Sequence, residues 1–214
     1  MKMKGLVGLA WLVLGLAALA FLLALWYRQT ALVARDEALP VIGEVATDFT
    51  LTTQWGDKLS LNDLKGKVWI AYFFFSTCPS ICPVMNHNMT AVQEAIRDNP
   101  DVLIVGFTVD PDTDKPEVLR RYGTKFGVQR GKWYYLTGER ALIYRVARQS
   151  FKLAAEPAPS GQSDSTHEFI HSEKFVLVDR QGRIRAYYTG TDKTSVQQLI
   201  RDIQKILREA ETSF

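Results

Sequence analysis

Apolar residues form one long run near the N-terminus, and the rest of the chain alternates between short apolar runs and helical stripes. Gly5–Trp26 contains no charged residue. As a helix this segment would extend about 33 Å, enough to span the hydrocarbon core of a bilayer. We therefore predict a single transmembrane helix over residues 1–27, a tether over 28–44 and one globular domain over 45–214.

The N-terminal run differs from a cleaved signal peptide, which is the alternative interpretation. A signal usually has an apolar region of about 7–15 residues followed by a small-x-small cleavage site. Leu32-Val33-Ala34 is a poor match to such a site, which favours a retained anchor. Two lysines precede the run, whereas the two arginines after it are accompanied by two acidic residues. The positive-inside rule then places the globular domain outside the cytoplasm, in the periplasm or an equivalent compartment where thiols can be oxidised.

The pattern after the tether predicts alternating strands and helices. Continuous apolar runs indicate buried strands at 67–75 and 102–109, with a shorter strand at 133–136. Apolar residues at helical spacing indicate three helices over 83–97, 116–126 and 139–148 and a last helix after residue 192. Turn residues indicate a hairpin within 48–61, a loop over 152–168 and a closing hairpin over 174–188.

This order of elements is that of an α/β fold with a thioredoxin-like sheet. The sheet would have parallel crossovers, a closing antiparallel pair, flanking helices and an N-terminal hairpin. Asp114 is predicted to cap the helix that begins at Pro116, and Thr191 or Asp192 to cap the last helix.

Composition and charge exclude one class of function. The formal net charge is only +3, and no run of basic residues interleaved with aromatic residues is present. Nucleic-acid binding therefore has no support.

The two cysteines, Cys78 and Cys82, carry the most specific chemical signal. They are separated by three residues and lie between an apolar strand and a helix predicted to begin at Pro83. The positive end of a helix dipole favours thiolate over thiol, so the pair suits redox chemistry or a soft metal. A purely structural disulfide across so short a loop would contribute only about 2 kcal/mol. A structural zinc site would normally need four Cys or His ligands, and the chain has only three histidines to add.

His171 is the candidate third ligand. It precedes the closing hairpin, which in a thioredoxin-like sheet packs beside the strand at 67–75, so the loop that contains it should face the cysteine loop. Two thiolates and one imidazole suit Cu(I), and the nitrogen also allows Cu(II), with zinc as the chemical competitor.

Other potential ligands have plainer interpretations. Met85 and Met89 fall on the apolar stripe of their helix and are predicted to pack in the core. His87 projects away from that stripe and should be exposed to solvent, and His167 lies in a polar loop. Asp110 follows a buried strand and is a candidate to interact with groups around the thiols.

Several motifs, in order, resemble the Sco/SenC family. They are Phe-Phe-Ser-Thr-Cys-Pro-Ser-Ile-Cys-Pro at 74–83, Thr-Val-Asp-Pro at 108–111 followed by Asp114 and Pro116, Leu-Thr-Gly at 136–138, and His-Ser at 171–172 before Phe-Val-Leu-Val-Asp at 175–179. The resemblance covers nearly all of residues 42–208. The chain departs from the family pattern in lacking a proline within 43–49 and in having Ser80 where Asp is common.

The resemblance implies a thioredoxin-like fold and copper bound by Cys78, Cys82 and His171. It also implies a role in assembling the binuclear copper centre of cytochrome c oxidase, by copper delivery, thiol reduction or both. The expected partners are the copper-accepting subunit of that oxidase, or another copper protein, and the membrane. The leading hypothesis is thus a membrane-anchored, extracytoplasmic copper chaperone.

Three alternatives stay open at this point, and they would make the protein an enzyme or a sensor. A thiol–disulfide reductase would act on the cysteines of a target metal site, but such proteins typically have two residues between the cysteines and a proline before the closing hairpin. This chain has three residues there and no proline after Pro159. A thiol peroxidase usually shows Pro-x-x-x-Thr-x-x-Cys, whereas Phe-Phe-Phe-Ser-Thr precedes Cys78. The third alternative is a redox or copper sensor.

Overall fold

The computed structural model describes residues 3–35, 39–153 and 172–211 and divides the chain into two compact units, residues 1–38 and 39–214. The first unit is a helix, α1 (Met3–Arg35). Within it, Trp11–Arg28 is long and apolar enough to cross a membrane, and the described residues contain no second helix of this kind. The helix continues through residues 28–35, the first part of the predicted tether, because no Gly or Pro interrupts that stretch.

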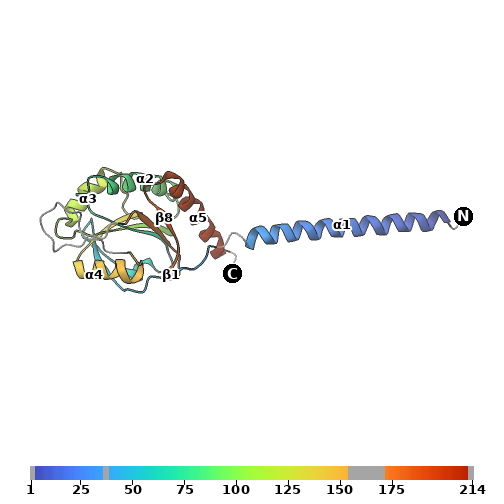
Figure 1. Cartoon of the computed structure of the whole chain (residues 1–214), viewed down its shortest axis with the longest axis horizontal. Helices are drawn as coiled ribbons and strands as arrows, with labels where there is room; N and C mark the ends of the chain where they lie inside the picture. Colours follow the sequence, from blue (N-terminus) through green and yellow to red (C-terminus); the bar gives the residue numbers. More distant parts are fainter. Residues whose placement is uncertain (1–2, 36–38, 154–171, 212–214) are drawn as a thin grey trace. The chain divides into compact units, whose positions relative to one another are not determined.

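The second unit contains one eight-stranded sheet in the order β1-β8-β7-β4-β5-β6-β2-β3 (Figure 1). β4 pairs in parallel with β5 and β5 with β6, and all other neighbours are antiparallel. The predicted N-terminal hairpin (β2 and β3) and closing hairpin (β7 and β8) are confirmed. The strand bounds are β1 Gly43–Glu44, β2 Thr50–Thr53, β3 Lys58–Ser60, β4 Val68–Phe74, β5 Val102–Thr108, β6 Trp133–Thr137, β7 Lys174–Val178 and β8 Arg183–Thr189.

Helices cover both faces of this sheet, with α2, α3 and α5 on one face and α4 on the other (Figure 1). Each face has its own core: the aromatic and aliphatic side chains of the sheet meet α2, α3 and α5 in one cluster, and α4 and the N-terminal hairpin in the other. The helix bounds are α2 Ile81–Ala95, α3 Pro116–Thr124, α4 Arg140–Arg145, continued by a π-helical segment Val146–Ser150, and α5 Lys193–Glu211, and a short 3-10 turn spans Leu61–Leu64.

The start of α2 differs from the prediction. The helix begins at Ile81 rather than Pro83, so Cys82 lies inside its first turn. Pro83 is tolerated there because the first-turn N–H groups have no partner within the helix.

The predicted cap of α3 is wrong. Lys115 occupies the N-cap position, and the side chain of Asp114 is buried instead. At α5 the prediction of Asp192 holds, because its carboxylate accepts from the backbone N–H groups of Thr194 and Ser195. The alternative, Thr191, donates its hydroxyl to Glu173.

The end of the predicted tether belongs to the globular unit. Gly43–Glu44 pairs with β8, and the Leu39 backbone N–H donates to Glu209 at 3.2 Å. The Arg185 guanidinium also donates to the Leu39 carbonyl oxygen. These contacts join segments about 140 to 170 residues apart, so local sequence pattern gave no sign of them.

Gly106 offers a test of how closely the side chains of β4 pack against β5. A Cβ atom at this position of β5 would lie 2.8 Å from Cζ of Tyr72 and 3.0 Å from Cε1 of Phe74. We expect Gly106→Ala to lower the free energy of unfolding by about 1–3 kcal/mol through overpacking. Urea unfolding of the protein in detergent measures this value. Gly43→Ala is the control, since its Cβ would meet Ile184 only at 3.7 Å, and equal stability losses in the two variants would contradict the prediction.

Candidate functional site

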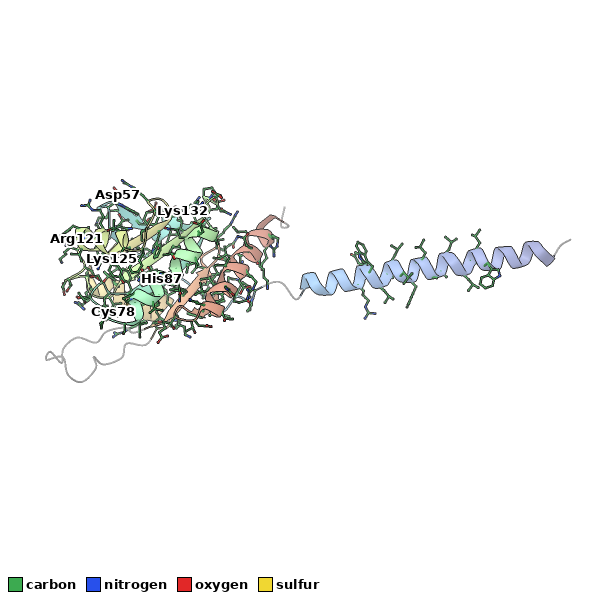
Figure 2. The ribbon with its side chains drawn as sticks, turned by 90° about the horizontal axis from the view of Figure 1, so that it is seen from above. Asp57, Cys78, His87, Arg121, Lys125 and Lys132 are labelled. Carbon is green, nitrogen blue, oxygen red and sulfur yellow. The ribbon has the colours of Figure 1, made fainter. Side chains whose placement is uncertain are left out.

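The cysteine loop leaves the sheet at the carboxyl end of β4. β4 and β5 run in parallel with Phe74 opposite Thr108, so the segment after β5 emerges at the same edge. β7 is antiparallel to β4, with Ala71 opposite Val176, so the chain enters β7 at this edge too. Figure 2 labels Cys78, which lies just before α2. The topology therefore brings the cysteine loop, the segment after β5 and the start of β7 to the same edge of the sheet.

Cys78 and Cys82 are both buried, with 8% and 5% of their surface exposed, and are not joined to each other by a disulfide. The Cys82 backbone N–H donates to Cys78 Sγ at 3.5 Å. Ser80, a residue type that commonly caps helices, makes no side-chain capping bond. The sulfur of Cys78 thus accepts at the N-terminus of α2, where a helix best stabilises negative charge.

The two thiols differ in acidity. Burial by itself would raise the pKa of Cys78, but backbone N–H groups of Cys82, Ser80 and Ile81 and the side chain of Cys82 outweigh it, and the pKa is lowered. Burial raises the pKa of Cys82 well above its ordinary value, and the neighbouring Cys78 and Asp114 raise it further. Cys78 is therefore the more acidic thiol of the pair and the one that forms a thiolate more readily.

Asn86 connects Cys82 to a buried group of tyrosines. Its Nδ2 donates to the Cys82 carbonyl oxygen at 2.8 Å and to the Tyr122 hydroxyl at 3.3 Å. Its Oδ1 accepts from the hydroxyls of Tyr72 at 2.8 Å and Tyr135 at 2.7 Å. These four bonds use the full capacity of an amide side chain. Burial raises the pKa of both Tyr72 and Tyr135, so they remain protonated donors.

Asp114 is a fully buried carboxylate that contacts the entry of the cysteine loop. Its carboxylate accepts from the Ser76 backbone N–H at 3.0 Å and from the hydroxyls of Ser76 and Thr108. Burial raises the pKa of Asp114, although these hydrogen bonds oppose the shift.

The secondary candidates behave as plain structural residues where the structure describes them. Met85 and Met89 are fully buried in the core, as predicted, and His87 is exposed on α2 (Figure 2). Asp110 forms an ion pair with Arg140 at 3.4 Å.

His167 and His171 lie outside the described residues. Within residues 3–35, 39–153 and 172–211, no group of three or more His, Cys, Asp or Glu side chains is placed to hold a metal ion. The described part of the site therefore supplies a pair of thiols.

Sequence reasoning missed Asn86 and its tyrosine partners. A signal was present, because Asn86 borders the apolar stripe of α2 and Tyr72 interrupts an apolar strand. Buried tyrosine hydroxyls and amides need hydrogen-bond partners, so two such residues in core segments indicate a shared polar contact.

Comparison with known proteins agrees with the resemblance seen in the motifs. The SCO1/SenC family model matches residues 41–208. Among curated proteins, "SCO1 protein homolog" of Bacillus subtilis (strain 168) is 36% identical over 158 residues, which make up 73% of this chain and 79% of that protein.

Solved structures confirm the predicted thioredoxin-like fold. One of them is the structure of BsSco, a member of the Sco family of cytochrome c oxidase assembly proteins in which a disulfide switch was identified. It matches with a TM-score of 0.67 and 33% identity, over 79% of this chain and 97% of BsSco. The structure of Bradyrhizobium japonicum ScoI with copper bound has a TM-score of 0.61 and 26% identity, over 73% of this chain and 98% of ScoI.

The difference in acidity predicts unequal reactivity of the two thiols. A lowered pKa gives Cys78 more thiolate at neutral pH, so iodoacetamide should modify it at least about tenfold faster than Cys82 at pH 7. The Cys78 rate should rise with pH and reach half its maximum below the ordinary cysteine pKa of about 8.5. Peptide mass spectrometry of the reduced protein measures both rates. Equal rates, or faster modification of Cys82, would contradict this assignment.

The contacts of Asn86 predict a large structural cost of its removal. Asn86→Ala leaves three tyrosine hydroxyls and the Cys82 carbonyl oxygen without this partner, and we expect a loss of about 2–4 kcal/mol in unfolding free energy. Asn88→Ala is the control on the same helix: Asn88 is also buried but makes one bond, to the Gly190 carbonyl oxygen, and should cost about 1 kcal/mol. Chemical unfolding compares the two variants, and similar losses of unfolding free energy would refute the claim that the four bonds of Asn86 stabilise the fold more than the single bond of Asn88.

Proposed function

Because the chain belongs to the SCO1/SenC family, we propose that it is a membrane-anchored copper chaperone that assists assembly of the binuclear copper centre of cytochrome c oxidase. In this proposal Cys78, Cys82 and His171 bind copper, which is cargo rather than a resident cofactor. One observation carries the proposal: two thiols in contact at a helix N-terminus, with one of them favoured as thiolate.

The donor set fits a soft metal ion. Thiolates select Cu(I), and an added imidazole nitrogen also accommodates Cu(II). His171 is three residues before Lys174, where β7 begins at the edge that bears the cysteine loop. Three residues span at most about 11 Å, so chain connectivity supports His171 as the third ligand.

The acidities of the thiols give each a role in loading. Cys78, whose pKa is lowered, forms a thiolate more readily and would be the first sulfur available to incoming copper. Cys82 must lose a tightly held proton before it can bind, so copper binding releases protons and should weaken as pH falls. A site with only three ligands leaves one side open for exchange with an acceptor. In the oxidised protein, a Cys78–Cys82 disulfide would remove both sulfur ligands.

The anchor and the topology form part of the same proposal. α1 would hold the chain in the membrane with the globular unit in the periplasm or an equivalent compartment. The copper acceptor would be the oxidase subunit that contains the binuclear centre, or another copper protein.

The unequal acidity of the cysteines also favours a second function, that of a thiol–disulfide reductase. The Cys78 thiolate would attack a target disulfide and release one target thiolate. Cys82 would then close on Cys78 and release the second, so that the target gains two electrons and the pair loses two. This chemistry needs both cysteines and has no use for His171.

Copper titration of the reduced full-length protein in detergent separates the two functions. We expect one copper per chain and, with Cu(II), a thiolate-to-copper charge-transfer band in the absorption spectrum, with a matching electron paramagnetic resonance signal. His171→Ala and Cys82→Ser should abolish the band and weaken binding at least about tenfold, or 1.4 kcal/mol.

The exposed His87 provides the matched control, since His87→Ala should leave the spectrum and the affinity unchanged. Copper binding that is indifferent to His171 would refute the ligand set. Appreciable turnover of a disulfide substrate by His171→Ala would then favour the reductase.

A further inference from the structure

Asp114 is a fully buried carboxylate in the segment between β5 and α3. No ion pair within the described part of the chain includes it, whereas the comparably buried Asp179 pairs with Arg183 and Arg185. Burying a carboxylate without a cation is costly. The hydrogen bonds that Asp114 accepts must offset that cost, and their location indicates what the residue does.

Two of its three donors come from one residue, Ser76. The Ser76 backbone N–H lies 3.0 Å from Oδ2, and the Ser76 hydroxyl donates to Oδ1. Ser76 is the second residue after β4 and the second before Cys78. The third donor, the Thr108 hydroxyl, belongs to the last residue of β5. Asp114 therefore joins the entry of the cysteine loop to the end of the neighbouring strand.

Asp114 is itself held from two directions. Its backbone N–H donates to the Asp110 carbonyl oxygen at 2.9 Å, and α3 begins two residues later. The Thr108 hydroxyl also accepts from the Asp110 backbone N–H at 3.0 Å. The carboxylate is thus fixed to the sheet, and its hydrogen bonds to Ser76 restrain the entry of the cysteine loop.

We propose that Asp114 is a positioning residue for the cysteine pair. By holding both donors of Ser76, it fixes the backbone that enters the loop, and this keeps Cys78 Sγ against the N-terminus of α2 and beside Cys82. The inference deepens the proposed function, since the same two sulfurs would bind copper, but it concerns their geometry and can be tested without copper.

Thiol–disulfide exchange with glutathione reports this geometry. Protein dithiol and glutathione disulfide give protein disulfide and two molecules of glutathione, so two protein thiols are oxidised as one glutathione disulfide is reduced. The equilibrium constant is the effective concentration of Cys78 and Cys82 toward each other, which falls when the loop that holds them loosens. It is measured on the full-length protein in detergent by trapping and mass spectrometry at several glutathione ratios.

We expect Asp114→Ala to lower this constant at least about fivefold. Asp114→Asn should stay within about twofold of wild type, because the amide oxygen still accepts from the Ser76 N–H and its NH₂ group can donate to the Ser76 hydroxyl. Asp202→Ala is the matched control: Asp202 is a buried carboxylate of α5 that accepts from the Tyr188 hydroxyl at 2.9 Å. It should reduce stability and leave the constant unchanged.

A wild-type constant for Asp114→Ala would overturn the proposal. So would an equal fall in Asp202→Ala, which would indicate general destabilisation, or in Asp114→Asn, which would indicate a charge effect. If Asp114→Ala does not fold, Ser76→Ala replaces it, with an expected fall of about threefold and a wild-type value as the refuting result. A failure of copper binding would leave these outcomes intact and would count against the proposed function alone.

Discussion

The burial of β4 on both faces and along both edges is the constraint on which the rest of the site depends. All seven of its residues are buried, and its backbone is paired with β5 on one side and β7 on the other. The chain can leave so enclosed a strand only at its end, and the segment that follows β4 is the cysteine loop. The parallel neighbour then brings Asp114 to the same edge, and the antiparallel neighbour brings the start of β7. The position of the cysteines at this edge of the sheet is thus a consequence of strand direction.

At this edge the N-terminus of α2 makes the two thiols unequal. Free N–H groups of the first turn converge on Cys78, whereas Cys82 lies within the helix and faces the core. The same inequality suits both chemistries considered for the pair. The more acidic thiol can capture a soft metal ion as its thiolate, and the same thiolate can attack a target disulfide that the second cysteine then resolves. The pair alone does not choose between them, and the imidazole of His171 is what the copper hypothesis adds.

Two buried groups of hydrogen-bonded side chains hold the segments that carry the thiols. Asn86 bonds the Cys82 carbonyl oxygen to three tyrosines, and Asp114 bonds the entry of the loop to β5. Satisfied networks of this kind hold one conformation, because each lost bond would leave a buried polar group unpaired. Close packing reinforces them, since Gly106 leaves only enough room for the ring of Tyr72.

Sequence alone determined those features whose signal is local or recorded in a motif. The apolar runs of β4 and β5, the stripes of α2 and α5, the core positions of Met85 and Met89 and the spacing of the cysteines can all be read from neighbouring residues. Tertiary structure decided the features that depend on distant partners: Asp114 bonds to Ser76 across 38 residues and Asn86 to Tyr135 across 49. From its position before Pro116, Asp114 was predicted to cap a helix. Only the fold shows that the donors around its carboxylate come from Ser76 and Thr108 instead. The inequality of the thiols emerged in the same way, since burial and the direction of backbone N–H groups exist only once the chain has folded.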